Sequence, residues 1–387
     1  MPTIYDFDVI IIGAGPAGCA AAIRLLRRRP SLAGRVLVMD KAVFPRPKLC
    51  GGGITRGAEA ALDALGVIVP ATAVSVTSVE FRFPTRTLTV RAGRMWPGYI
   101  FKVVRRETFD HALLREAARY GAVIHEGEAA KEVSVASDAA RIYGDRLEYR
   151  TRVVIAADGA NSLVRRGLGL GYPKRLGAAS EMLIPAMPGG QRDQVPRKHA
   201  LFDFGPILSG LQGYYWEFPT IFEGAPMVSA GVADSRILER PGARSVLTEL
   251  LDRRGGQVQS ATDVHHARGA PMRWFHPRTP QSVSRVLFAG DAAGAEPLFN
   301  EGISTALEFG IFAADAVVGA FDESDFSFAG YDAALLRSGL GRALSAKLAI
   351  AQRFYASPGR WQYVPLAWPS RRFAHSLARV VPNWAKS

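Results

Sequence analysis

The feature that most constrains the fold is a glycine-rich turn near the start of the chain. Residues 9–12 are a short β-branched apolar run, as expected of a strand buried on both faces. Gly13, Gly15 and Gly18 follow in the spacing Gly-x-Gly-x-x-Gly, and Pro16 suits the first turn of a helix. In this motif the first glycine permits the tight turn, the second admits a pyrophosphate and the third lets helix and strand pack closely. The sequence therefore predicts a dinucleotide at the start of this helix.

A second strand and an acidic residue extend this pattern. Residues 20–28 continue as a helix, and residues 35–39 form another buried apolar strand. Asp40 follows Gly18 by 22 residues, close to the expected position of a carboxylate that holds a ribose hydroxyl. A glycine-rich turn without a ligand is the alternative. The succession of strand, loop, helix, strand and acid favours the dinucleotide.

Composition narrows the class of protein and its partners. A chain of 387 residues, 48% of them hydrophobic, is long enough for two domains with buried cores. Cys19 and Cys50 are too few for a disulfide framework and no signal peptide is visible, so we expect a cytoplasmic protein. The net charge of +13 predicts an anionic partner, such as a phosphorylated ligand or a membrane surface. No nucleic-acid motif and no set of metal ligands is visible, so neither partner is predicted.

Three motifs between residues 13 and 291 resemble the fingerprints of class A flavoproteins similar to para-hydroxybenzoate hydroxylase. They are the glycine-rich loop, Ala-Asp-Gly-Ala-Asn-Ser at residues 157–162 and Gly-Asp at residues 290–291. The resemblance implies a non-covalent FAD, with Asp158 and Asp291 near its ribityl chain and pyrophosphate. For both aspartates the alternative is a turn residue that caps its own backbone.

The same resemblance implies further contacts with the cofactor. Arg106 matches an arginine that contacts FAD in these proteins. Residues 297–303 resemble the segment whose backbone amides face the flavin pyrimidine edge, where a helix start would favour a reduced, anionic flavin. The residues that we expect to contact FAD are Gly13, Gly15, Pro16, Ala17, Gly18, Asp40, Lys41, Lys48, Cys50, Gly51, Arg106, Asp158, Gly159, Gly290, Asp291, Pro297, Gly302 and Ile303.

Two further motifs resemble the geranylgeranyl reductase family. Residues 45–53, Pro-x-Pro-Lys-x-Cys-Gly-Gly-Gly, match its cysteine–glycine loop, and residues 214–219, Tyr-Tyr-Trp-Glu-Phe-Pro, match its Tyr-x-Trp-x-Phe-Pro signature. The resemblance covers nearly the whole chain and implies that reduced flavin delivers hydride to isoprenoid double bonds. The chain departs from the family at Thr220, where lysine is usual, and at residues 229–233, Ser-Ala-Gly-Val-Ala, where Gly-x-Gly is usual. These departures leave the substrate open.

Cys50 and three aromatic residues are the candidates for catalysis and substrate binding. Tyr214, Trp216 and Phe218 alternate along a predicted strand, so their rings share one face and would line an apolar substrate; an ordinary sheet core is the alternative. Cys50 would donate a proton, or else fill space as a small buried side chain. The glycines at residues 51–53 suggest backbone that passes close to a flat ligand. We assign Cys50, Tyr214 and Trp216 to catalysis, and Tyr214, Trp216 and Phe218 to the substrate.

The predicted fold is an interrupted α/β arrangement, because nucleotide-binding segments come in three blocks with antiparallel strands between them. A further helix is predicted over residues 244–253. The prediction is a Rossmann-type FAD-binding domain of residues 1–72, 106–175 and 276–330, an inserted antiparallel-sheet substrate domain of residues 73–105 and 176–275, and a helical C-terminal cap of residues 331–387.

These observations predict an FAD-dependent oxidoreductase that reduces isoprenoid carbon–carbon double bonds. Only one Gly-x-Gly-x-x-Gly is present, so the electron donor would be NAD(P)H that binds transiently, or a protein reductant. Two alternatives stay open. One is a flavin-dependent monooxygenase or halogenase on the same fold, and the other is a flavoprotein that modifies or matures a protein partner.

The C-terminal part of the chain has a one-sided charge pattern. Residues 333–387 contain nine Lys or Arg and no Asp or Glu, with aromatic residues interleaved. Residues 370–381 would form a short basic amphipathic helix. Such a stretch is either a solvated face or a surface that lies on an anionic membrane, which would make the protein peripheral at the inner face of the membrane.

Charge reversal separates these two interpretations of the tail. Each basic group near an anionic surface contributes about 1 kcal/mol, so the triple variant Arg371→Glu, Arg372→Glu and Arg379→Glu should lose binding to anionic vesicles at low salt. Co-sedimentation with phosphatidylserine-containing vesicles measures the binding, and phosphatidylcholine vesicles are the control. Equal binding by parent and variant would assign the tail to a solvated face.

Overall fold

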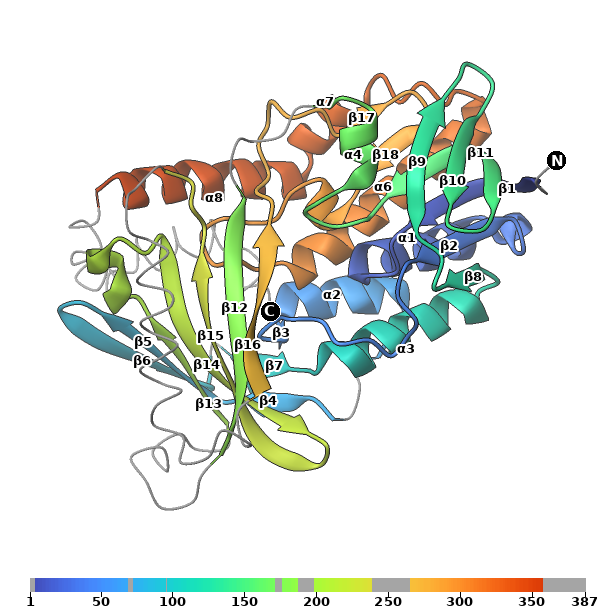
Figure 1. The fold of residues 1–387 in the computed structure, drawn as a ribbon. Coiled ribbons are helices and arrows are strands. Elements are labelled where there is room, and N and C mark those ends of the chain that lie inside the picture. The colour runs from blue at the N-terminus through green and yellow to red at the C-terminus, as the bar shows by residue number, and fades with distance from the viewer. Residues whose placement is uncertain are drawn as a thin grey trace.

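The computed structural model describes residues 4–68, 72–94, 96–170, 176–186, 198–238 and 265–357. The helices predicted over residues 244–253 and 370–381 lie outside these ranges. Within them the chain forms an eight-stranded sheet, a seven-stranded sheet and a three-stranded sheet, with helices packed on the first sheet and over the end of the second (Figure 1). The mixed α/β architecture agrees with the sequence prediction.

The eight-stranded sheet is organised around its first strand. Residues 9–12 and 36–39 are fully or almost fully buried, as their apolar β-branched character predicts. The neighbours of β1 on both sides run parallel to it. The parallel strands, in spatial order, are β18 (Val286–Phe288), β11 (Glu148–Ala156), β1 (Ile4–Ile12), β2 (Val36–Asp40) and β8 (Val123–Glu126). Antiparallel β17 (Ser282–Val283) pairs with β18, and the hairpin of β9 (Ala130–Val135) and β10 (Ala140–Gly144) pairs with β11.

Helix α1 (Pro16–Arg28) fixes the helical layer. It packs most closely on α6 (Ile303–Glu323), where a Cβ atom on Gly310 would lie 2.3 Å from the carbonyl oxygen of Ala17. α6 is long and apolar enough to span a membrane, but 67% of its most apolar window is buried inside the protein, as in a core helix. The other helices here are α2 (Arg56–Leu65), α3 (Arg106–Arg119) and α4 (Leu163–Gly167), with short 3-10 turns η1 (Pro30–Leu32) and η5 (Gly290–Ala292).

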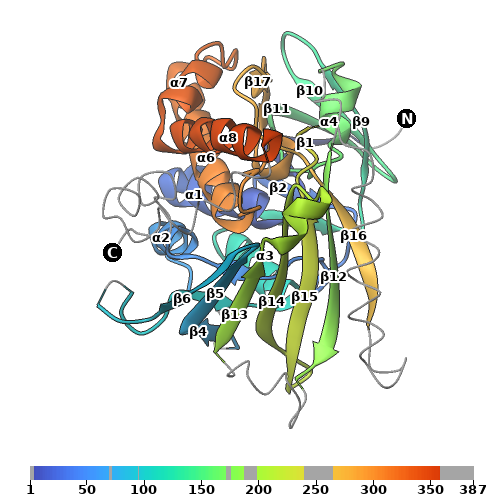
Figure 2. The same ribbon diagram turned by 90° about the vertical axis from the view of Figure 1, so that its left-hand side faces the viewer.

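The seven-stranded sheet forms the second body of the protein (Figures 1 and 2). Its pairs are antiparallel except for β5 and β13, which run parallel, so the sheet is mixed at this one place. Its strands, in spatial order, are β16 (His265–Met272), β12 (Gly177–Pro185), β15 (Ala225–Asp234), β14 (Gly213–Phe222), β13 (His199–Asp203), β5 (Ser78–Phe83) and β6 (Arg86–Arg91), and η3 (Gly205–Ser209) follows β13.

Two smaller units join the sheets. The three-stranded sheet is ordered β3 (Gly53–Ile54), β7 (Phe101–Val103) and β4 (Val74–Val76). Helix α7 (Tyr331–Arg337) ends before Ser338, whose hydroxyl accepts a hydrogen bond from Gly341 at 3.1 Å and caps α8 (Gly339–Ala356). Figure 2 shows α8 beside α6, above the end of the seven-stranded sheet. Ala351 and Tyr355 on α8 share a buried apolar cluster with strand β14.

Candidate cofactor and active site

The strand register brings the three fingerprint motifs to one edge of the first sheet. Ile12, the last residue of β1, pairs with Ala156 of β11 and with Met39 of β2, and Ala156 pairs with Phe288 of β18. The loops that follow these parallel strands therefore begin at the same level. A crevice outside the carboxyl ends of parallel strands is where such folds bind nucleotides.

The glycine-rich loop touches both of the other motifs. A Cβ atom on Gly13, whose φ is +105°, would lie 2.3 Å from the carbonyl oxygen of Ala157. A Cβ atom on Gly290 would lie 2.8 Å from the Cβ atom of Ala17. Gly18 has the packing role that the motif predicts, because its Cβ would lie 1.9 Å from the Gly13 carbonyl oxygen. Three segments far apart in sequence thus form one cradle.

Two observations show that this cradle fits FAD. Gly15 caps α1, and a Cβ atom there would have nothing within 4 Å, so the space at the helix start is open for a phosphate. Asp158 accepts a hydrogen bond from the amide of Val164 at 3.2 Å through Oδ2, while its buried Oδ1 has no hydrogen-bond partner among the residues described. Asp158 thus caps its own turn, as the alternative predicted, and keeps an oxygen for a ligand.

Asp40 supports the loop as well as facing it. Its Oδ2 accepts the Ala14 amide and its Oδ1 the Ala42 amide, each at 2.8 Å. The carboxylate at the end of β2 therefore fixes the shape of the glycine-rich loop, and a ribose hydroxyl would share it. Lys41 next to it is exposed. Gly159, with φ of +82°, continues the turn that follows Asp158.

Asp291 lies among positive charges at the third motif. Burial raises the pKa of Asp291, and the charges of Lys48, Arg106 and Arg273 act against this rise. Lys48 and Arg106 were predicted as cofactor contacts, whereas the buried Arg273 was not. Arg273 donates to the carbonyl oxygen of Ala160 in the second motif at 3.2 Å. This cluster of cations suits the phosphates of a dinucleotide.

Arg106 connects the cofactor region to Cys50. Its guanidinium donates to both oxygens of buried Asp110, at 2.7 and 2.8 Å. Burial alone would lower the pKa of Arg106, but Asp110 and Cys50 beside it raise this pKa above its usual value. Cys50 Sγ also accepts a hydrogen bond from the amide of Gly52 at 3.4 Å. The thiol therefore faces a cation and an N–H group.

The glycines after Cys50 let the backbone pass close to protein groups. A Cβ atom on Gly51 would lie 2.9 Å from the ring of Phe218 and 3.2 Å from Nε1 of Trp216. A Cβ atom on Gly52, whose φ is +73°, would lie 2.0 Å from the carbonyl oxygen of Val104. In the described part of the chain, the flat groups beside Gly51 are thus the aromatic side chains of Phe218 and Trp216.

Tyr214, Trp216 and Phe218 form one aromatic wall on β14, as the alternation predicts. The ring centroids of Tyr214 and Trp216, and those of Trp216 and Phe218, are 6.3 Å apart. Tyr215 belongs to a different apolar cluster on the opposite face. Phe202 of β13 packs beside the wall on the same face of the sheet, with its ring centroid 5.2 Å from that of Tyr214 and 5.0 Å from that of Phe218. All three rings are buried, so the wall belongs to the sheet core, and its Trp216 and Phe218 border Gly51.

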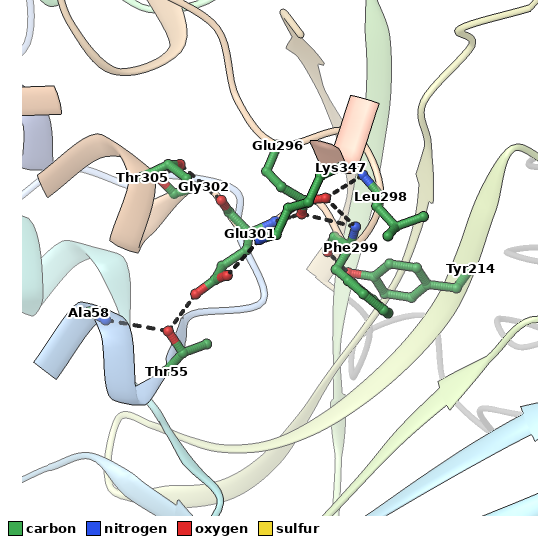
Figure 3. Close-up of polar contacts among 10 residues, drawn as sticks. All are labelled: Thr55, Ala58, Tyr214, Glu296, Leu298, Phe299, Glu301, Gly302, Thr305 and Lys347. Atoms are coloured by element: carbon green, nitrogen blue, oxygen red, sulfur yellow. Dashed lines mark hydrogen bonds and ion pairs between the residues drawn. The ribbon is translucent and has the colours of Figure 1, made fainter. Parts of the chain in front are cut away.

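The segment before α6 is shaped by a buried carboxylate (Figure 3). Glu296 accepts hydrogen bonds from the amides of Leu298, Phe299 and Glu301, at 2.5 to 3.2 Å. These three amides are thus already bound, and the amides left to face a flavin in this segment are those of residues 300, 302 and 303. The carbonyl oxygen of Pro297 accepts from Ser235 at 2.7 Å, and Gly302 and Ile303 begin α6.

The same segment is tied to two other helices. Glu301 accepts a hydrogen bond from the hydroxyl of Thr55, the N-cap of α2, and lies 3.6 Å from Nζ of Lys347 on α8. Burial alone would lower the pKa of Lys347, but Glu296 and Glu301 raise it. Burial raises the pKa of Glu296, and Lys347 opposes that rise. Tyr214 donates to the Phe299 carbonyl oxygen at 2.5 Å, so the aromatic wall contacts this segment (Figure 3).

Comparisons with known proteins agree with this geometry. A family model described as FAD binding domain matches residues 6–189. A menaquinone reductase of Mycolicibacterium smegmatis is 30% identical over 327 residues, which cover 80% of this chain and 75% of that protein. Digeranylgeranylglycerophospholipid reductase 1 of Methanothermobacter thermautotrophicus is 27% identical over 353 residues, 83% of this chain and 79% of that protein.

A solved structure shows the same fold over nearly the whole chain. The geranylgeranyl bacteriochlorophyll reductase-like protein of Thermoplasma acidophilum has a TM-score of 0.77 at 21% identity, covering 99% of this chain and 98% of its own. Fold and cradle together define a class A FAD-dependent oxidoreductase. More closely, the chain belongs to the geranylgeranyl reductase family. The family that the sequence motifs indicated is therefore confirmed.

Several residues of this site were not predicted. Glu296 and Glu301 are charged residues in an otherwise apolar stretch, and Lys347 lies among the apolar positions of α8. A buried charge of this kind needs an oppositely charged or hydrogen-bonding partner. A charged residue within an apolar stretch could therefore have indicated a buried polar cluster. Nothing in the sequence paired the two glutamates with Lys347, because they come from a loop and a distant helix. Glu181 and Arg273 were equally unmarked.

Gly15→Val tests the position of the phosphate. The side chain would fill the open space at the start of α1, so FAD should be lost while the unfolding midpoint in urea stays near that of the parent protein stripped of FAD. The flavin absorbance of the purified protein measures this. Gly319→Val is the matched control, because a Cβ atom there also has nothing within 4 Å, but on α6 away from the loop. A full flavin complement in Gly15→Val would contradict the assignment.

Lys347→Met tests the buried charge cluster. Removing one partner of a buried ion pair costs about 3–5 kcal/mol in the free energy of unfolding. Without the Lys347 ammonium, the folded-state pKa of Glu296 rises further. A carboxyl group with a raised folded-state pKa stabilises the fold while it is protonated, and this stabilisation is lost as the pH rises through that pKa. The loss should therefore be larger at pH 8 than at pH 5 in urea unfolding. The control is Arg353→Met on the exposed side of α8, which should change little.

Proposed function

We propose that this FAD-dependent oxidoreductase reduces carbon–carbon double bonds of an isoprenoid substrate. The observation that carries the proposal is the close approach of the Gly51 backbone, next to Cys50, to Trp216 and Phe218. It joins the two motifs of the family, a proton-bearing side chain and an apolar wall, at one place. The relatives named menaquinone reductase and digeranylgeranylglycerophospholipid reductase support an isoprenoid as the substrate class.

The residues of the chain have distinct tasks in this proposal. Bound FAD would supply the hydride. The aromatic wall would hold the apolar substrate chain and exclude water. Exclusion of water strengthens the electrostatic interactions that assist hydride and proton transfer. Cys50 would hold a proton at Sγ and release it to the alkene carbon, and the Arg106 guanidinium beside it would stabilise the thiolate that remains. Tyr214, held by the Phe299 carbonyl oxygen, would keep the wall in register.

The source of electrons and the place of action extend the proposal. NAD(P)H that binds transiently or a protein reductant would reduce the flavin, in keeping with the single dinucleotide motif. A cytoplasmic protein at the inner face of the membrane would meet an apolar, membrane-resident substrate directly. The acid-free tail of residues 333–387 supports this location.

Anaerobic reoxidation of the reduced flavin tests the activity. The dithionite-reduced protein should be reoxidised by a geranylgeranyl lipid or a menaquinone. Tandem mass spectrometry should find the two added hydrogen atoms for each double bond in the isoprenoid chain, which excludes simple reduction of the quinone ring to the quinol. Oxygen uptake coupled to NAD(P)H and to a hydroxylated or halogenated product would instead support a monooxygenase or halogenase. A stoichiometric protein captured and modified by the enzyme would support a role in maturation.

Cys50→Ala tests the assigned acid. The variant should bind FAD and be reduced by dithionite, but reoxidation by the isoprenoid should slow by at least about a hundredfold, since general acid catalysis contributes about 10²–10⁴-fold. Cys50→Ser should also be slow, because a hydroxyl is a far weaker acid of similar size. Cys19→Ala is the control thiol, since Cys19 is buried in α1. Parental rates in both Cys50 variants would reduce Cys50 to a space-filling role.

A further inference from the structure

A buried carboxylate outside the predicted motifs connects Cys50 with the aromatic wall. Glu181 on β12 is 8% exposed, and its Oε2 accepts a hydrogen bond from the backbone amide of Cys50 at 2.9 Å. Its Oε1 accepts the hydroxyl of Ser229 at 2.7 Å. Ser229 Oγ in turn accepts from Nε1 of Trp216 at 3.2 Å. One continuous chain of hydrogen bonds therefore runs from the Cys50 backbone to the indole.

The strand register explains how Trp216 reaches this chain. Glu181, Gly231 and Trp216 form one row across β12, β15 and β14, and therefore share a face of the sheet. A Cβ atom on Gly231 would lie 2.2 Å from Cζ2 of Trp216, so the indole lies over the glycine. Ser229 and Gly231 belong to the stretch in which this chain departs from the Gly-x-Gly of its family. Ser229 and Gly231 thus both position the indole, one through a hydrogen bond and the other by leaving room for the ring.

Burying the Glu181 carboxylate costs folding free energy unless hydrogen bonds and a nearby cation compensate for the lost water. Burial raises the pKa of Glu181, while the Ser229 hydroxyl, the Cys50 amide and the charge of Arg105 oppose the rise. Nη1 of Arg105 is 3.8 Å from Oε1 of Glu181. A buried charge is retained where its hydrogen bonds fix a defined geometry. Here the defined geometry is the spacing between Cys50 and Trp216.

We propose that Glu181, acting through Ser229, is a positioning residue that holds the Cys50 loop and the Trp216 indole at a fixed separation. The role of this separation in catalysis rests on the proposed function, in which an alkene lies between the proton donor Cys50 and the aromatic wall. The existence of the bridge does not rest on that function, because the bridge consists only of groups of this chain. The experiment below therefore measures the bridge without a substrate.

The rate at which iodoacetamide alkylates Cys50 in the FAD-bound protein reports opening of the loop. Cys50 is half-buried and Cys19 is fully buried, so mass spectrometry resolves one reactive thiol. Glu181→Met removes both acceptors at similar volume and should speed alkylation on the order of tenfold, the equivalent of about 1.4 kcal/mol in the opening free energy. Glu181→Gln can accept from Cys50 and donate to Ser229, so it should restore the parental rate.

The matched control is Glu217→Met. Glu217 is also 8% exposed and lies in the same sheet, but it bonds Tyr215 on the opposite face. Its replacement should leave Cys50 alkylation within about twofold of the parent. Parental labelling of Glu181→Met, or equal acceleration in Glu217→Met, would overturn the proposal.

A second variant keeps the test decisive if Glu181→Met does not fold. Ser229→Ala leaves the Glu181–Cys50 bond but removes the hydroxyl that links Glu181 to the indole, so tryptophan emission should change while Cys50 is alkylated at the parental rate. Trp216→Phe identifies the part of the emission that comes from Trp216. Unchanged emission in Ser229→Ala would overturn the indole half of the bridge. Failure to reduce an isoprenoid would refute the proposed function and leave these measurements intact.

Discussion

The parallel pairing of β1 with β2 and β11 is the constraint on which the rest of the structure depends. Parallel strands that end in register deliver the residues after them to one edge of the sheet, and here these residues are Gly13, Asp40 and Asp158. The contact between Gly13 and the Ala157 carbonyl oxygen locks two of these loops together. A dinucleotide site needs this convergence, because its phosphates, riboses and rings extend over several loops.

The second sheet depends on the first through a small number of buried polar bridges. Glu296 shapes the segment before α6, and this segment accepts the Tyr214 hydroxyl from β14. On the other side of the wall, Glu181 reaches from β12 to the Cys50 loop. Apolar packing alone tolerates sliding between sheets, whereas hydrogen bonds between buried groups fix one arrangement. These bridges therefore fix the position of the aromatic wall relative to the cofactor cradle.

The helix α8 takes part in the same arrangement from above. Lys347 places a buried ammonium beside Glu301, and Tyr355 adds its ring to the cluster of the wall. A helix that follows the first sheet in sequence thus covers the end of the second sheet.

Local sequence was sufficient wherever the function of a residue follows from its own neighbours in the chain. The Gly13–Gly18 loop, the alternation of Tyr214, Trp216 and Phe218, and the buried strands follow from spacing and side-chain type, because turn geometry and strand period are local properties. Family motifs added the cofactor and the class of enzyme. The glycine after Cys50 was recognised as a place where the backbone passes close to another group, and the structure places Phe218 there.

Only the tertiary structure decided which buried charges meet. Glu296, Glu301 and Lys347 are up to 51 positions apart and come from two segments, and the Glu181–Ser229–Trp216 bridge crosses three strands. A sequence shows that a charged residue stands in an apolar stretch, but not where its partner is. The pairing follows from strand register and helix placement, which long-range packing determines. For that reason the sequence identified the cofactor and the wall, and the fold alone revealed what holds them together.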